Sequence, residues 1–103
     1  MYYILDDNNK PIRVDSYKEY YNWKEQVPGK HPVCSIQVAK TSTDRTQVST
    51  VFLGLDHGYS GKPVLWESMV FSSDDKELDE TCIRYTSHEE ALKGHKELCE
   101  KYL

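Results

Sequence analysis

Two apolar runs separated by a glycine-containing break do most to constrain the fold of this chain. Residues 48–71 read VSTVFLGLDHGYSGKPVLWESMVF, and the break HGYSGKP lies between the runs Gln47–Leu55 and Val64–Phe71. Each run is short, rich in β-branched and aromatic residues and bounded by turn formers, which is typical of strands. The two runs therefore predict an antiparallel hairpin with a long loop. The first run is apolar on both faces near its centre, which favours a central place in the sheet.

Shorter extended segments lie on either side of this hairpin. Tyr2–Leu5 and Ile12–Val14 flank the turn-forming sequence DDNNKP and predict a second, small hairpin. Two more strands are expected at Val33–Ala39 and Thr81–Tyr85, and the polar stretch Thr41–Arg45 is expected to be a turn.

Two helices are marked by a serine or threonine followed three residues later by glutamate. Ser16 with Glu19 opens a helix over residues 15–26, and either Thr86 with Glu89 or Ser87 with Glu90 opens a C-terminal helix. The order of elements predicts an α+β fold in one domain, residues 1–103. We expect a single antiparallel β-sheet of about four to six strands, with an N-terminal and a C-terminal helix packed on it.

Charge and cysteine content exclude several functional classes. The formal net charge is −4, which argues against direct nucleic-acid binding because that needs clustered Lys and Arg. Cys34, Cys82 and Cys99 are odd in number and form no C-x-x-C pair, so reduced thiols are expected rather than a disulfide framework or a zinc knuckle. No basic leader or membrane-spanning run is present, so we expect a cytoplasmic protein. The sequence also contains no Walker loop and no G-x-G-x-x-G motif, and we expect no cofactor.

Five titratable residues are the strongest candidates for a catalytic or ligand-binding site. They are Asp56, His57 and Glu67, with Arg84 and His95 farther along the chain. A carboxylate that orients an imidazole is the arrangement of a general base or of a metal-bound histidine. A metal site needs three or four converging ligands, however, and no nearby Ser or Cys has the sequence context of a nucleophile. We therefore predict a polar site without assigned catalytic or metal-ligating residues, in which Asp56 or His57 binds the loop backbone.

Gly94 and His95 stand out in the C-terminal helix. His95 belongs to a predicted inner stripe that also contains Ala91, Leu92, Leu98, Cys99 and Tyr102. Glycine inside a helix costs about 1 kcal/mol relative to alanine, so we expect a neighbouring element to approach closely at Gly94. Two interpretations of His95 stay open. It hydrogen-bonds to a neighbouring strand, or it meets His57 or Glu67 at the edge of the core.

Two segments are candidate contact surfaces for a partner protein. The first helix carries Tyr17, Tyr20, Tyr21 and Trp23, at a spacing that fits either core packing or a binding face. The acidic segment SSDDKELDE at residues 72–80 is interpreted as either a solvated loop or a docking site. Its candidate contact residues are Asp74, Asp75, Glu77 and Asp79.

Four blocks of the sequence together resemble a known group of proteins. The blocks are YILD, VSTVFLGLDH, LWESMVF and RYTSHEEALKGH, at Tyr3–Asp6, Val48–His57, Leu65–Phe71 and Arg84–His95. They resemble, in the same order, a group of small uncharacterised proteins encoded by tailed bacteriophages and prophages. Trp66 and Ser68 depart from that group, which more often has Phe and Thr there.

The resemblance implies a phage accessory protein in the cytoplasm of a bacterial host, and it implies no reaction. By analogy with small acidic phage proteins, we expect a non-catalytic, anti-CRISPR-like inhibitor of a bacterial defence system that binds a host protein, such as a nucleic-acid-binding effector. The alternative is a small-molecule or metal-sequestering protein, or a minor hydrolase, centred on Asp56, His57, Glu67 and His95. A virion or assembly component is a third candidate.

Overall fold

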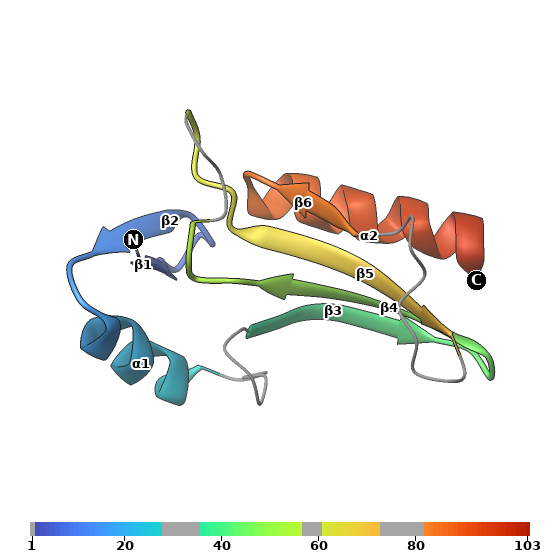
Figure 1. The fold of residues 1–103 in the computed structure, drawn as a ribbon, viewed down its shortest axis with the longest axis horizontal. Coiled ribbons are helices and arrows are strands. Elements are labelled where there is room, and N and C mark those ends of the chain that lie inside the picture. The colour runs from blue at the N-terminus through green and yellow to red at the C-terminus, as the bar shows by residue number, and fades with distance from the viewer. Residues whose placement is uncertain (1, 28–35, 57–60, 73–81) are drawn as a thin grey trace.

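A computed structural model describes residues 2–27, 36–56, 61–72 and 82–103 and confirms the predicted α+β fold. Figure 1 shows α1 beside the small β1–β2 hairpin at one end of the molecule, and α2 running along the larger sheet. In chain order the elements are β1 (Tyr2–Leu5), β2 (Pro11–Val14), α1 (Tyr17–Gln26), β3 (Ile36–Ser42), β4 (Thr46–Phe52), β5 (Trp66–Ser72), β6 (Ile83–Tyr85) and α2 (His88–Tyr102).

The larger sheet of the described residues has four antiparallel strands in the order β3-β4-β5-β6. The predicted hairpin is confirmed as β4 and β5, and β4 has the predicted central position. Strand β3 continues to Ser42, so the turn expected from Thr41 was placed too early. Thr41 and Ser42 pair with Val48 and Gln47, and this pairing outweighs their local preference for a turn. The predicted strand start at Val33 lies outside the described residues.

Strands β1 and β2 form their own two-stranded sheet, which differs from the single sheet expected. The hairpin is linked to the segment that follows β4 by a bridge between Tyr2 and Leu55 and by a 2.8 Å hydrogen bond from the Tyr3 N–H to the Gly54 carbonyl. Gly54 has a φ of +73°, which turns the chain out of the extended conformation just after β4. Regular pairing therefore ends there, and α1 packs against the small hairpin.

Helix α2 covers one face of the larger sheet. The side chains that point toward it alternate along β4 and β5 and are fully buried: Val48, Thr50, Phe52, Trp66, Ser68 and Val70. Ala91, His95 and Leu98 are the buried residues of the helix. Leu92 was predicted in this stripe but is 45% exposed. A helix turns by about 100° per residue, so Leu92 points away from the sheet when Ala91 faces it.

Both helices begin at the predicted serine caps. The Glu19 N–H donates to Ser16 Oγ at 3.3 Å, and the Glu90 N–H donates to Ser87 Oγ at 3.1 Å. Of the two alternatives for α2, the structure therefore selects Ser87. The Thr86 hydroxyl donates to the Glu90 carboxylate at 2.7 Å, and this bond, followed by one from Ser87, lowers the pKa of Glu90.

Candidate functional site

The side chain of His95 lies between α2 and the sheet, with both ring nitrogens hydrogen-bonded. Its Nδ1 is 2.7 Å from Thr50 Oγ1, and its Nε2 is 2.9 Å from Thr41 Oγ1. Thr50 Oγ1 is in turn 2.5 Å from Ser68 Oγ. These three hydroxyls come from β3, β4 and β5, so the network fastens α2 across three strands. Of the two interpretations of His95, the structure supports the hydrogen bond to neighbouring strands.

The imidazole of His95 is neutral near neutral pH. The side chain is 8% exposed, and this burial lowers its pKa below the ordinary histidine value. A neutral imidazole carries one ring proton, so it donates to one of the two threonines and accepts from the other. Either direction satisfies both nitrogens.

The lowered pKa of His95 predicts acid sensitivity of the fold. The folded chain binds fewer protons than the unfolded chain through the histidine range, so the free energy of unfolding falls as pH drops from the ordinary histidine pKa toward the lower folded pKa. His88, whose pKa burial also lowers, acts in the same direction. Urea unfolding between about pH 8 and about pH 5.5 measures this dependence. His95→Gln is expected to make it shallower, and an unchanged slope would contradict the assignment.

Gly94 allows the ring of Tyr85 to lie directly against α2, which confirms the expected close approach. A Cβ atom at Gly94 would lie 2.1 Å from the Tyr85 hydroxyl oxygen and 2.4 Å from its Cε1 and Cζ atoms. Burial raises the pKa of the Tyr85 hydroxyl, and the nearby Ser68 hydroxyl partly opposes that shift without reaching full hydrogen-bond geometry. Tyr85 thus adds the edge strand β6 to the contact between α2 and the sheet.

Glu67 lies on the opposite face of the sheet from His95. Successive side chains of a strand point to opposite faces, and its neighbours Trp66 and Ser68 both face α2. Glu67 instead accepts a hydrogen bond from the Cys82 thiol at 2.7 Å and lies 3.6 Å from Nε of Arg84. The structure therefore brings Glu67 and Arg84 together and separates both from His95.

Asp56 anchors the end of the long loop, as predicted for Asp56 or His57. Its Oδ1 accepts a 2.9 Å hydrogen bond from the backbone N–H of Val64, on the far side of the loop. His57 itself lies outside the described residues. Among the described residues, no three His, Cys, Asp or Glu side chains are grouped so that they could hold a metal ion.

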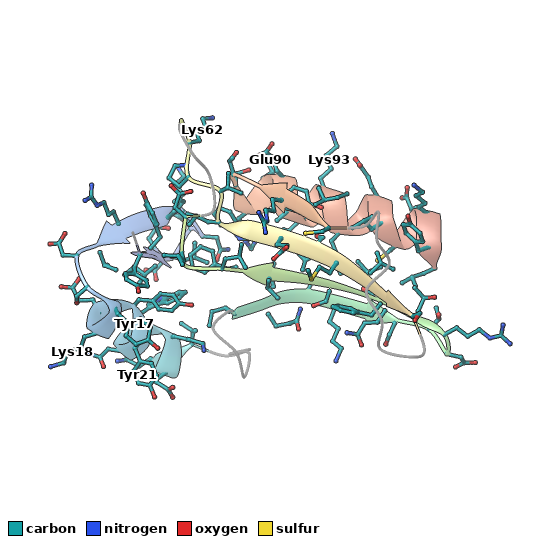
Figure 2. The ribbon with its side chains drawn as sticks, in the orientation of Figure 1. Tyr17, Lys18, Tyr21, Lys62, Glu90 and Lys93 are labelled. Carbon is teal, nitrogen blue, oxygen red and sulfur yellow. The ribbon has the colours of Figure 1, made fainter. Side chains whose placement is uncertain are left out.

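The aromatic residues of α1 divide between the core and the surface. Tyr20 is 3% exposed and Trp23 is partly buried, so these two serve core packing rather than a contact surface. Tyr17 is 52% exposed and Tyr21 is 45% exposed. Figure 2 shows both on α1, with Lys18 beside them, at the end of the molecule away from Glu90 and Lys93. We call Tyr17 and Tyr21 the tyrosine face.

The predicted acidic contact residues lie outside the described residues: Asp74, Asp75, Glu77 and Asp79. Cys34 is also outside them, whereas Cys99 is a free thiol and the Cys82 thiol donates to Glu67. The tyrosine face is therefore the predicted contact surface that the structure describes.

Three hydroxyl residues of the His95 network were not predicted from the sequence as its partners: Thr41, Thr50 and Ser68. A signal for two of them is present in the sequence. Thr50 and Ser68 occupy alternate positions between buried apolar residues on β4 and β5, so both point inward toward the helix that carries His95. Thr41 has no such signal, since it follows an irregularity in the pairing of β3 with β4.

Comparison of the chain with protein-family models, with curated proteins and with solved structures finds no match. In the part of the chain that the structure describes, no helix is both long enough and apolar enough to cross a bilayer.

Proposed function

We propose that this chain is a phage-encoded accessory protein that inhibits a bacterial defence system, in the manner of an anti-CRISPR protein, by binding a host protein without catalysis. The tyrosine face on α1 is the surface proposed to make the contact. The observation that carries the proposal is the exposure of two neighbouring tyrosine rings, Tyr17 and Tyr21, whose centroids lie 6.1 Å apart. The sequence resemblance to phage proteins supports the bacterial cytoplasm as the site of action.

Packed aromatic rings connect Tyr17 of the tyrosine face to the core. Tyr17 contacts Tyr2 at 5.6 Å between centroids and Tyr20 at 6.4 Å, and Tyr20 contacts Trp23 at 6.1 Å. Trp23 then packs edge-on against the fully buried Phe52. A ring held in this way loses little conformational entropy on binding, and tyrosine is enriched at the energetically dominant positions of protein interfaces.

The polar residues first considered for chemistry have structural partners that support a non-catalytic function. Asp56 binds the backbone of the long loop, and Glu67 binds Cys82 and Arg84. Both nitrogens of His95 are occupied by threonine hydroxyls. These bonds hold the hairpin and α2 in place, and they account for Asp56 and Glu67 without a reaction.

The net charge favours a basic partner. A formal charge of −4 on 103 residues attracts a nucleic-acid-binding effector, whose own binding surface is positive. Complementary charge of this kind raises the association rate more than the final affinity, and salt weakens the effect. The proposed partner is therefore a host defence protein of that class.

The proposal predicts that the tyrosine face is needed for inhibition. We expect expression of the chain in a bacterium with an active CRISPR system or another defence system to restore plating of a targeted phage. Tyr17→Ser with Tyr21→Ser is expected to reduce that restoration by about 100-fold or more, since losing two interface tyrosines costs about 3 kcal/mol. Plating efficiency on matched lawns measures the effect.

Leu92→Ser is the matched control, because Leu92 is as exposed as Tyr21, at 45%, but lies on α2. It should leave inhibition unchanged. Circular dichroism establishes that the double tyrosine variant is folded. Equal inhibition by the folded double variant and the wild-type chain would remove the tyrosine face from the proposal, and no relief of any defence system would remove the proposed function.

A further inference from the structure

Thr41 combines an exposed side chain with a hydroxyl that is bonded to a buried imidazole. It lies near the end of β3 and is exposed to solvent, whereas His95 is 8% exposed. The 2.9 Å distance from Thr41 Oγ1 to His95 Nε2 is typical of the hydrogen bond between a nucleophilic hydroxyl and its general base. A reagent in solution therefore reaches the Thr41 residue, whose hydroxyl already has a proton acceptor in place.

The second nitrogen of His95 is held by a further group, as an effective base requires. Thr50 Oγ1 lies 2.7 Å from Nδ1 and is fixed by Ser68 Oγ at 2.5 Å, and both residues are fully buried. When the Nδ1 proton is donated to Thr50, Nε2 has a free lone pair that accepts the Thr41 proton. Thr50 and Ser68 are positioning residues, because they orient the imidazole and do not touch a substrate.

We propose that Thr41 is a nucleophilic hydroxyl, activated by His95, that accepts an acyl group from an activated ester. This inference does not depend on the proposed function, because β3 and α2 carry it and α1 does not.

The reaction is a single acyl transfer. Thr41 Oγ1 attacks the ester carbonyl carbon and forms a new C–O bond, while the Thr41 proton moves to Nε2 of His95. The bond between the carbonyl carbon and the leaving oxygen then breaks, and the leaving group departs with the electron pair. The proton on His95 passes to the leaving group or to water. The product is an ester on Thr41, and no oxidant or metal takes part.

Ser42 is an internal control for this reactivity. It follows Thr41 directly on β3 and is also exposed. Adjacent strand residues point to opposite faces, so the Ser42 side chain projects away from α2 and His95. The two residues are therefore both exposed and adjacent on one strand, and only the Thr41 hydroxyl is bonded to His95.

The test is limited labelling of the intact chain with p-nitrophenyl acetate, followed by peptide mass mapping. Activation by a positioned base typically contributes 10²–10⁴-fold, so Thr41 is expected to acquire an acetyl group about 100-fold faster than Ser42. Equal labelling of the two residues, or labelling confined to lysines and the N-terminal amine, would overturn the proposal. This comparison is made within the wild-type chain and needs no variant.

Variants separate activation from mere exposure. His95→Gln keeps an amide near the two threonines but cannot take up a proton, so Thr41 labelling should fall to the Ser42 rate. Thr41→Ser should retain fast labelling. In the wild-type chain the Thr41 labelling rate should rise with pH as His95 loses its proton and then level off. A rate that instead increases tenfold per pH unit throughout, as for simple hydroxide activation, would contradict a role for His95.

Discussion

Replacing Gly54 by alanine is expected to lower the free energy of unfolding by about 3 kcal/mol. Two effects add. Gly54 has a φ of +73°, a conformation that costs an alanine about 1 kcal/mol. The new Cβ would also lie 2.2 Å from Cε1 and 2.5 Å from Cζ of Tyr20, which is 3% exposed, so the ring must shift against the residues packed around it. Urea unfolding measures the loss.

Gly61→Ala provides the matched control for this prediction. Gly61 has a similar φ of +78°, but a Cβ there would meet no atom of the described residues within 4 Å. Gly61→Ala is expected to lower the free energy of unfolding by only about 1 kcal/mol, which is the cost of the backbone conformation alone. Equal losses for the two variants would show that the contact with Tyr20 does not constrain Gly54.

The contact between Gly54 and Tyr20 also bears on function. Tyr20 is the buried ring that stacks on Tyr2 and supports Tyr17, so a shift of Tyr20 displaces the tyrosine face. Gly54→Ala should therefore weaken inhibition even under conditions in which the variant stays folded.

Replacing Gly94 by alanine is expected to lower the free energy of unfolding by about 2 kcal/mol. The sign of this effect is diagnostic, because the same change inside an exposed helix stabilises by about 1 kcal/mol. Here the added methyl group would occupy the position of the Tyr85 ring, which is packed against the core cluster around Trp66. Tyr85 must then swing outward and expose its ring.

A double-mutant cycle isolates this contact. Tyr85→Ala removes the obstructing ring, so Gly94→Ala in that background should become neutral or stabilising by about 1 kcal/mol. Unfolding curves of the four variants give the coupling free energy directly. Additive effects would mean that Gly94 has another role in α2.

The central features of the fold were predictable because they depend on local patterns. Alternating apolar residues and a glycine-rich break predicted the β4–β5 hairpin. Ser16 predicted the start of α1, and Thr86 or Ser87 predicted the start of α2 to within one residue. The separation of β1 and β2 from the larger sheet was not predictable, because it depends on the backbone conformation of Gly54 and not on hydrophobic periodicity. The extension of β3 to Ser42 likewise depends on pairing with β4.

The candidate site was predictable only in part, because hydrogen-bond partners depend on strand register. The sequence predicted a close approach at Gly94, and it left a structural hydrogen bond as one of two open interpretations of His95. It did not identify Thr41 as a partner of His95, because the two residues are far apart in the chain. Grouping Glu67 with His95 by residue type overlooked that Glu67 alternates with inward-facing neighbours and so projects from the other face of the sheet.

The central claim is that the chain inhibits by binding. The most direct test of this claim is the stoichiometry of inhibition. Once plating assays identify the affected defence system, its purified effector is titrated with the wild-type chain and its activity is measured. A non-catalytic binder is expected to reach full inhibition near one chain per effector binding site, and Tyr17→Ser with Tyr21→Ser is expected to shift the curve to higher concentration. Full inhibition by a small fraction of an equivalent, increasing with time, would contradict the account and indicate an enzyme.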